Sequence, residues 1–551
     1  MHEPDEVFNQ PAPLVGGNRF RSHPALRQAL DRWWPGLDTS GLEVLGADVA
    51  AAAWQHQAVL AHRHTPRLVT HDTVGRRVDR VEFHPAYHAL LQRALAAGLH
   101  GTAWAGESGG HVLRAAGFLL FTELEASVTC PVSMTYAATP ALRGQGDWTQ
   151  AWLAGVADRR YDAAEAPIAQ KTALTLGMGM TERQGGSDVR SNTTRATPQG
   201  RDAAGRAVYA LRGHKWFFSA PMCDGHLVLA QAPGGLTCLL LPHWLDDGTR
   251  NAVRLERLKD KLGNRANASA EVTFDDAIAW RLGEEGEGVA QILRMGALTR
   301  LDCALGSAGL MRHAVSLALH HCRQRWAFGA PLVDQPAMAA VLADLALESE
   351  AAMALALRLA VAVQRSEAGD EAETALRRVL TPVAKYWVCK RGAVLAQEAM
   401  ECLGGNGYVE ADAEGVMARI YREMPVNSIW EGAGNIQALD QLRALREARC
   451  VEALEALWQT VPRFDAERAA LLAALASEAG VADARGLAGR IALLTQAVLL
   501  VQYAPDEVVD AFAPRLAQGA PAVFGEHGLV VPAQPLLARA LAPSPSGRGQ
   551  G

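Results

Sequence analysis

The spacing of apolar residues divides the chain into helical and β segments. In "EFHPAYHALLQRALAAGLH" (residues 82–100) and "GGHVLRAAGFLLFTELEASV" (residues 109–128), apolar residues recur every three or four positions. This period is typical of helices that bury one face. We therefore expect the chain from about residue 25 to residue 170 to be mostly helical.

Between about residues 177 and 282 the pattern changes to short runs that favour β-strands. These runs are "HLVLAQ", "LTCLLLP" and "AEVTF", and the turn-forming sequences "APGG" and "DDGTRN" lie among them. Short apolar runs separated by Gly, Pro, Asn and Asp are typical of strands joined by turns. The pattern predicts an antiparallel β domain.

Long helical periods return from Gly286 onward. We expect helices from about Val289 to the "HHCRQR" segment, from Pro336 to Glu367, and from Glu371 to about Leu403. Pro336 suits the first turn of a helix, and glycines suit helix ends. After Arg449 come about a hundred residues rich in Ala and Leu, also predicted to be helical.

The predicted fold class is α+β, and the order of segments argues against a doubly wound α/β enzyme. The expected divisions are an N-terminal helical domain (1–176), a middle β domain (177–283), a C-terminal helical bundle of four helices (284–448) and an extra helical domain (449–551). The last residues, "APSPSGRGQG", are expected to be a disordered tail.

The composition is that of an ordinary globular protein. Of the 551 residues 49% are hydrophobic and 20% are charged, and we find no apolar run that approaches 18 residues. Eight scattered cysteines and an N-terminus without a signal-like pattern indicate a cytoplasmic protein with reduced thiols and no membrane segment. The net charge of −6 argues against a general attraction to nucleic acid, so such binding would need a local basic patch.

A glycine-rich loop, "GMGMTERQGGSDV" (residues 177–189), opens the β domain. Thr181 and Ser187 offer hydroxyl groups, and Gly185 and Gly186 allow a ligand to approach the backbone closely. Such a loop can bind a flat polar heterocycle or a phosphate. A glycine-rich β turn with no ligand is the commoner explanation when the loop is taken alone.

Three consecutive aromatic residues stand in "RGHKWFFSAP" (residues 212–221). If this segment is a strand, Phe217 and Ser219 share one face, and Trp216 and Phe218 share the other. One face could lie against a planar ring while the other packs into the core. That both faces lie in the core is equally compatible with the sequence.

Two further segments suit contacts with a nucleotide. In "RQRWAFGAPLVDQ", Arg325 and Gln335 suit phosphate and adenine, and the glycines of "ECLGGNGY" (401–408) permit close backbone approach. A loop at a helix end is the commoner explanation of each segment when it is taken alone. The histidines in "HRH" and "HH" lack partner ligands at metal-binding spacing, so no metal site is predicted.

One carboxylate, Glu431, lies in an apolar stretch of "NSIWEGAGNIQ" (residues 427–437). It stands between Trp430 and Gly432, with Ile429 before them. A catalytic base whose pKa must rise by desolvation often has such neighbours. A turn residue beside a core aromatic is an equally good interpretation of this segment by itself.

Taken together, these motifs resemble the acyl-CoA dehydrogenase family over roughly residues 50 to 445. "MTERQGGSD", "HKWFFS", "LGGNGY" and "IWEG" occur in the family's order and at comparable spacing. The resemblance is closest to the AidB-type branch, flavoproteins of the bacterial response to DNA alkylation that are similar to isovaleryl-CoA dehydrogenase. It rests on "GMGMTERQGGSDV", "RLERLKDKLGNR" and "YREMPVNSIWEGAGNI", and that branch also has an extra C-terminal helical domain.

The resemblance implies a homotetramer that binds FAD between the helical and β domains. Glu431 matches the family's catalytic base, which removes an α-proton while the β-hydride goes to flavin N5. Some members carry the base instead on the helix that matches "GALTRLD", where this chain has Thr299 and Arg300. Arg325 and Gln335 match residues that reach FAD across a subunit interface. The implied cofactor-binding residues are Met178, Thr181, Ser187, Phe217, Phe218, Ser219, Arg325, Gln335, Gly405, Ile429, Trp430, Gly432, Gly434 and Asn435.

The chain departs from the family pattern at the adenine end of this site. Glu401 replaces the usual glutamine, and a carboxylate is a poor neighbour for pyrophosphate unless it is protonated or points elsewhere. Ala433 and Asn435 replace the usual threonine and glutamine. We therefore expect FAD to be bound differently or more weakly at its adenine end.

Two functions compete on these observations. The first is an alkylation-response flavoprotein that binds double-stranded DNA without sequence preference and retains weak acyl-CoA dehydrogenase activity. The second is a metabolic dehydrogenase of short or branched acyl-CoAs with no DNA role. Arg443, Arg446 and Arg449, at three-residue spacing, are the candidate DNA contacts on one helical face. A solvated helix end is the commoner explanation of the three arginines taken alone. Residues 451–551 carry seven arginines, no lysine and ten acids.

Overall fold

The computed structural model describes residues 7–410, 416–476 and 480–542. The predicted tail lies almost entirely outside these residues. The chain forms two compact units. The helical unit comprises Met1–His56, His111–Leu124 and Cys303–Gly551, and the β unit comprises Gln57–Gly110 and Glu125–Asp302. Divisions between the units fall within helices α3 (Ala52–Arg63) and α8 (Gly288–Gln324).

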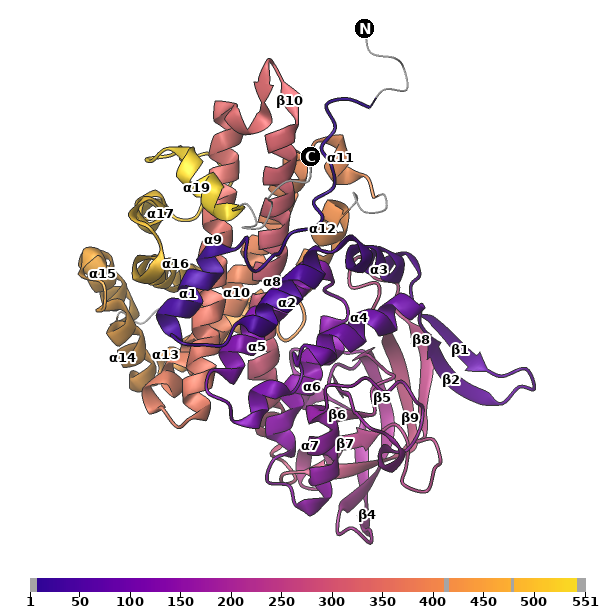
Figure 1. The fold of residues 1–551 in the computed structure, drawn as a ribbon. Coiled ribbons are helices and arrows are strands. Elements are labelled where there is room, and N and C mark those ends of the chain that lie inside the picture. Colours follow the sequence, from indigo (N-terminus) through magenta and orange to yellow (C-terminus); the bar gives the residue numbers. More distant parts are fainter. Residues whose placement is uncertain (1–6, 411–415, 477–479, 543–551) are drawn as a thin grey trace. The chain divides into compact units, whose positions relative to one another are not determined.

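The β unit is built around a seven-stranded sheet (Figure 1). Its path runs β3-β6-β4-β5-β9-β7, and an additional β6–β7 pairing closes it, while β8 adds to β9. Closure leaves fewer open strand edges. The strands are β3 (Leu176–Gly179), β4 (Arg195–Arg201), β5 (Ala207–Ser219), β6 (Gly225–Ala232), β7 (Gly235–Pro242), β8 (Val253–Leu258) and β9 (Ser269–Leu282).

The three predicted runs lie in β6, β7 and β9, so the strand prediction is confirmed. The sheet is mostly antiparallel, but β6 pairs in parallel with both β3 and β4. Inward-facing side chains from several strands, including Leu211, Val228, Leu239 and Phe274, form one buried cluster. This core holds the strands that carry the glycine loop and the aromatic triplet.

The N-terminal part of the β unit is mostly helical, as expected, but it also contains a β-hairpin. Strands β1 (Arg67–His71) and β2 (Arg77–Glu82) form an antiparallel hairpin that projects from the rest of the unit (Figure 1). The buried Asp79 ties strand β2 to strand β8, because its carboxylate accepts a hydrogen bond from the amide of Leu255 at 3.2 Å. The helices of this part are α4 (Pro85–Ala96), α6 (Thr129–Leu142) and α7 (Gln150–Ala157), with short 3-10 turns at Thr102–Ala105, Asp147–Thr149, Ile168–Gln170 and Val189–Ser191.

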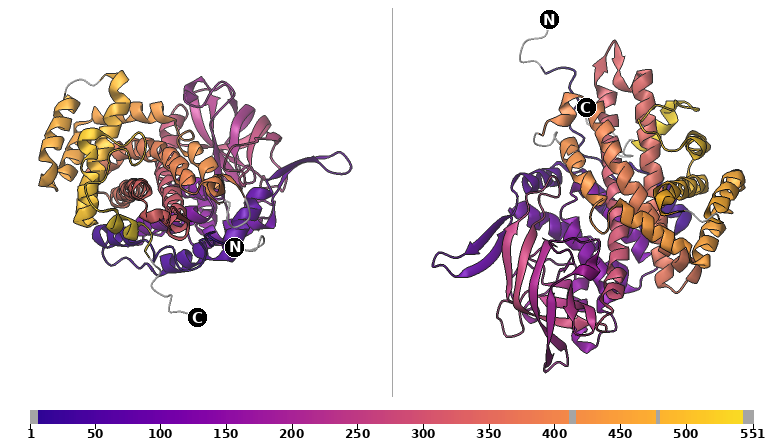
Figure 2. Two further views of the ribbon diagram at one scale, coloured as in Figure 1. Left: turned by 90° about the horizontal axis from the view of Figure 1, so that it is seen from above. Right: turned by 180° about the vertical axis from the view of Figure 1, so that it is seen from behind.

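Long helices dominate the helical unit, and the three predicted ones are confirmed. They are α8, α9 (Pro336–Glu367) and α10 (Glu371–Cys402), and Pro336 occupies the first turn of α9 as expected. Figure 2 shows this bundle from two further directions. The other elements up to residue 445 are α1 (Pro24–Trp33), α2 (Ser40–Ala50), α5 (Gly110–Leu124), β10 (Trp326–Ala327), β11 (Ala330–Pro331), the 3-10 turn Leu332–Asp334, α11 (Gly405–Tyr408), α12 (Val416–Asn427) and α13 (Gly434–Leu445).

The extra C-terminal block is helical, as predicted, and packs against the bundle. Its central helix α16 contacts α9, α10 and α13. The block contains α14 (Ala448–Trp458), α15 (Asp465–Ala476), α16 (Ala484–Tyr503), α17 (Asp506–Phe512), α18 (Arg515–Gln518) and α19 (Ala533–Ala540), with 3-10 turns at Pro462–Phe464 and Val481–Asp483.

Helix α16 is long and apolar enough to have the composition of a membrane span. The stretch Val481–Tyr503 reaches a mean hydropathy of 1.4. However, 78% of its apolar window is buried inside the protein. Its hydrophobicity is therefore explained by its place at the centre of the C-terminal block.

A buried ionic cluster joins the C-terminal block to the bundle. Arg515 at the start of α18 binds the Glu348 carboxylate at 2.7 Å and also binds Asp344, both on α9. Arg391 of α10 binds the other Glu348 oxygen at 3.1 Å. Burial by itself would raise the pKa of Glu348, but the two guanidinium groups hold that pKa below its usual value.

We predict that Arg515→Ala lowers the free energy of unfolding by about 3–5 kcal/mol, because it leaves a buried carboxylate short of a partner. The matched control is Arg463→Ala in the same block, which removes an exposed pair with Asp510 and should cost less than about 1 kcal/mol. Urea unfolding of both variants measures the difference. Equal losses of unfolding free energy in the two variants would show that the buried Arg515 cluster stabilises the protein no more than an exposed ion pair.

Candidate functional site

The glycine loop and strand β5 lie together in the β unit. The amide of Trp216 donates to the carbonyl of Thr181 at 2.8 Å, which ties the loop to the strand. Two glycines leave room for neighbouring side chains at this junction. A Cβ at Gly179 would lie 2.4 Å from the Phe218 ring, and one at Gly186 would lie 2.3 Å from the Thr181 hydroxyl.

A bulge changes the faces of the aromatic triplet. The register of β5 against β9 shifts between Lys215 and Phe218, so strict alternation fails there. Phe217 is 51% exposed, as expected for a residue on the ligand-facing side. Trp216, however, does not share the face of Phe218, because the Lys259 ammonium lies 3.5 Å from the Trp216 ring centroid and 4.8 Å from that of Phe217.

Phe218 needs a correction to its predicted role. Its side chain is 2% exposed, and its ring stacks on His226 with the centroids 3.9 Å apart. A ring held in the core in this way cannot stack on a cofactor, so any contact there must come from the backbone. Ser219 is half-buried, and its hydroxyl lies 3.2 Å from that of Ser269.

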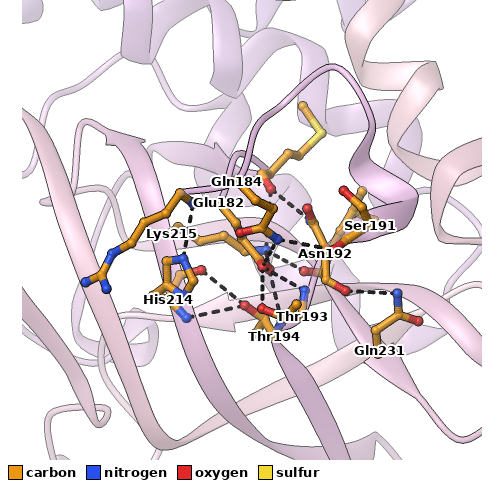
Figure 3. A network of polar contacts seen from close by, with 12 residues as sticks. Glu182, Gln184, Ser191, Asn192, Thr193, Thr194, His214, Lys215 and Gln231 are labelled. Carbon is orange, nitrogen blue, oxygen red and sulfur yellow. Dashed lines mark hydrogen bonds and ion pairs between the residues drawn. The ribbon is translucent and has the colours of Figure 1, made fainter.

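An ion pair with no exposed side-chain surface lies beneath the loop (Figure 3). The Lys215 ammonium donates to the Glu182 carboxylate at 2.9 Å and to the carbonyl of Leu229 at 2.7 Å. The same carboxylate accepts the amide of Thr193 at 2.7 Å and that of Thr194 at 3.1 Å. One pair thus joins the loop to strands β5 and β6.

The charge of Glu182 is stabilised by this arrangement. Burial would raise the pKa of its carboxyl, but the Lys215 charge and the hydrogen bonds from the threonines and Gln184 hold the pKa well below 4.5. Neither Glu182 nor Lys215 was predicted as a site residue from the sequence. The available signal was composition, because Lys215 is one of six lysines and stands in a strand-like aromatic run.

In the helical unit, Glu431 lies in the turn between α12 and α13. Its φ is +62° and that of Gly432 is +95°, so two consecutive residues are left-handed. For a residue with a side chain this costs of order 1–3 kcal/mol, and such strain often occurs at functional sites. The carbonyl of Glu431 accepts from Gln437 at 2.9 Å, and that of Gly432 accepts from Gln437 at 3.0 Å and from Lys385 at 2.8 Å.

The expected apolar cage around Glu431 is not formed by its sequence neighbours. Ile429 is 63% exposed and Trp430 is half-buried, with its indole nitrogen 3.2 Å from the Asn427 amide oxygen. The turn presents these side chains outward because α12 ends at Asn427. Neighbours in sequence therefore do not supply the desolvation that the apolar pattern predicts.

Of the predicted nucleotide contacts in the helical unit, Arg325 and Gln335 flank the β10–β11 hairpin, and Gly405 lies in another loop. Arg325 directly follows α8, and its guanidinium binds the carbonyl of Asn9. Gln335 precedes α9 and donates to the carbonyl of Ala327 at 3.0 Å. Gly405 begins the short α11. Glu401 is exposed, as are Ala433 and Asn435 on the far side of the turn, while Gly434 is buried.

The arginine stripe is not a single helical face, contrary to the prediction. Helix α13 ends at Leu445, Arg446 is its C-cap, and Arg449 belongs to α14. All three side chains are exposed, but Arg449 pairs with Glu447 at 2.6 Å. A three-residue spacing predicts a common face only where one helix continues.

The β-unit surface fits a planar cofactor. Phe217 is an exposed aromatic ring on β5, and the Thr181 carbonyl of the loop is hydrogen-bonded to the same strand. Glycines leave room for this contact between the loop and the strand. Ser187 is exposed in the same loop, where its hydroxyl can bind a polar group. Stacking plus a few placed hydroxyl and amide groups is the donor set that a flat heterocycle needs.

We predict that Lys215→Met lowers the free energy of unfolding by about 3–5 kcal/mol at pH 7, because Glu182 stays buried without its cation. In the wild type, the lowered pKa of Glu182 contributes to the free energy of unfolding, and this contribution is fully present above about pH 4.5. It is lost as the pH falls through the lower pKa of the folded state. The deficit of the variant should therefore shrink in acid. The Lys215→Met/Glu182→Gln double variant should recover part of it. Urea midpoints at pH 7 and pH 4 measure this, and a pH-independent deficit would contradict it.

Comparison with known proteins matches three consecutive families. Residues 9–163 match the adaptive response protein AidB N-terminal domain, 177–277 the acyl-CoA dehydrogenase middle domain and 286–445 the acyl-CoA dehydrogenase C-terminal domain. AidB of Escherichia coli (strain K12), itself named as an acyl-CoA dehydrogenase, is 50% identical over 80% of each chain.

Two solved structures are similar over nearly the whole chain. The apo form of Bd2924 is 30% identical with a TM-score of 0.83, covering 91% of this chain and 100% of that one. Caenorhabditis elegans ACDH-11 in complex with C11-CoA is 27% identical with a TM-score of 0.80, covering 98% and 93%. The helical, β and helical order of the family fold is thus confirmed, and FAD is the cofactor of this family. The chain belongs to the acyl-CoA dehydrogenase family, with an AidB N-terminal domain, and is an FAD-dependent oxidoreductase of that type.

Proposed function

We propose that this protein oxidises a short or branched acyl-CoA between its α and β carbons, with Glu431 as the base. The observation that carries the proposal is the carboxylate itself, held in a strained left-handed turn at the junction of α12 and α13. FAD, when bound, would supply the acceptor for the β-hydride. The ACDH-11 complex with C11-CoA supports an acyl-CoA substrate and makes a medium-length chain the first alternative to test.

Phe217 of β5 would stack on the flat ring of the cofactor, and Thr181 and Ser187 of the glycine loop would bind its polar edge. In the helical unit, Glu431 takes the α-proton, which requires its carboxylate to come within hydrogen-bond reach of the α-carbon. Thr299 on α8 is buried and Arg300 is a cation, so neither offers a carboxylate as a second base.

We predict that Glu431→Gln lowers the rate of flavin reduction by acyl-CoA at least about 1000-fold, because it keeps the shape but removes the base. Stopped-flow absorbance with butyryl-, isovaleryl- and undecanoyl-CoA measures the rate, and FAD content should be unchanged. Glu401→Gln is the control, since it neutralises an exposed carboxylate in another loop. Similar rates for wild type and Glu431→Gln would place the base elsewhere.

A second function, double-stranded DNA binding in the response to DNA alkylation, is supported by the AidB relationship and by two exposed arginines. Arg443 and Arg446 flank the end of α13, and the described residues show no ion pair for either. Without a base-reading motif, their contacts would be to phosphate. In this function the dehydrogenase chemistry is weak and the protein acts in the cytoplasm.

We also propose a homotetramer. Its support is Phe328, which is 98% exposed at the tip of the β10–β11 hairpin with a left-handed φ of +52°. Phe328 lies beside the exposed Trp326. Two neighbouring exposed aromatic side chains are better suited to contact with another subunit than to contact with water. The same hairpin begins at Arg325 and lies next to Gln335, the residues that the family resemblance assigns to FAD of a neighbouring subunit.

We predict that Arg443→Ala and Arg446→Ala each reduce the salt dependence of DNA binding by about one unit of slope, since a variant that neutralises one phosphate fewer releases one counterion fewer. Arg449→Ala is the matched control and should change the slope less, because Glu447 already neutralises Arg449. Fluorescence anisotropy of one duplex across a salt series measures the slopes. Equal slopes for all variants would exclude these arginines, and the absence of binding at low salt would leave the dehydrogenase function alone.

A further inference from the structure

The turn that carries Glu431 is held by two side chains from outside it. Glu431 and Gly432 are both left-handed, and a left-handed residue with a side chain persists where its surroundings enforce it. The surroundings here are two buried donors. Gln437 of α13 is 0% exposed and Lys385 of α10 is 1% exposed.

Both donors bind the backbone carbonyls of the turn. The Gln437 amide donates to the carbonyls of Glu431 and Gly432, at 2.9 and 3.0 Å. The Lys385 ammonium donates to the carbonyl of Gly432 at 2.8 Å. A buried ammonium is costly to desolvate, so a lysine that binds a single carbonyl here holds that carbonyl firmly.

Gly432 lies close to the Gln437 side chain. A Cβ at this position would lie 2.6 Å from the Gln437 amide nitrogen, and the φ of +95° favours glycine in any case. The side of the turn that faces α10 and α13 is therefore filled by the two donors. Because the carbonyls of Glu431 and Gly432 are both held, the backbone of the turn is fixed. The fixed backbone sets the direction of the Cα–Cβ bond of Glu431.

We infer that Lys385 and Gln437 are positioning residues for α-proton abstraction, which hold the Glu431 carboxylate in its reactive orientation. The inference rests on the proposed role of Glu431 as the base. In the step concerned, the α C–H bond breaks, its electron pair stays on the thioester, and the proton passes to the Glu431 carboxylate. Return of a proton from that carboxyl re-forms the bond, so the exchange needs no oxidant.

Deuterium exchange therefore isolates this step from hydride transfer. Holoenzyme is incubated in deuterium oxide with butyryl-, isovaleryl- or undecanoyl-CoA, and the mass of the recovered thioester reports α-deuteration. Because small displacements of a catalytic group have large effects, Gln437→Leu and Lys385→Met should each slow exchange about 10- to 100-fold. The substrate concentration for half-maximal exchange and the FAD content should stay at the wild-type values.

The matched control is Gln441→Leu. Gln441 lies one turn further along α13, is equally buried and makes no hydrogen bond to the Glu431 turn among the described residues. It should exchange at the wild-type rate. If Gln437→Leu and Lys385→Met matched Gln441→Leu, or if they lost FAD together with exchange, the positioning role would be overturned. Because both act on one turn, the double variant should be less impaired than the product of the single effects.

A crystal structure of Gln437→Leu provides a readout that needs no substrate. The φ of Glu431 should leave the left-handed region in this variant, and an unchanged φ would overturn the inference whatever the activity. A wild-type enzyme that exchanges no α-hydrogen with any of the three probes would instead contradict the proposed dehydrogenase function. The two failures are therefore distinguishable.

Discussion

The glycine loop of the β unit and the Glu431 turn of the helical unit each depend on a buried ammonium group that holds the backbone in place. In the β unit, Lys215 and Glu182 fix the glycine loop against β5 and β6. In the helical unit, Lys385 fixes the turn of Glu431. A loop that must expose glycines, hydroxyls or a carboxylate to a ligand cannot bury enough of its own surface to stay ordered. Its rigidity has to come from strong donors placed behind it.

Lysine suits this role better than arginine at both sites. Its ammonium is a compact charge that can bind one carbonyl or carboxylate at the end of a flexible stem, whereas the guanidinium fork suits two-oxygen partners. The arginines of this chain are used in that second way, as where Arg515 bridges Asp344 and Glu348. The protein has six lysines, and most lysines in proteins are exposed to solvent. Lys215 and Lys385 differ from that rule because they are almost fully buried.

The sequence predicts the parts of this structure that depend on local periodicity. The 3.6-residue period and Pro336 place α9 from its first residue to its last, and apolar runs place β6, β7 and β9. What it misses depends on contacts between distant residues. The parallel pairing of β3 with β6 joins segments about fifty residues apart, and the bulge in β5 reverses the side on which Trp216 lies.

The same distinction separates the two levels of the candidate site. Glu431, Phe217 and the glycine loop lie in contiguous motifs and can be proposed from the sequence. Lys385 is 47 residues before the carbonyl that it binds, so no local motif contains both. The apolar letters around Glu431 were misleading for a related reason, since a turn between two helices points successive side chains in different directions, and Ile429 faces outward. The environment of this base is set by α10 and α13 behind the turn, and the motif around Glu431 supplies the carboxylate.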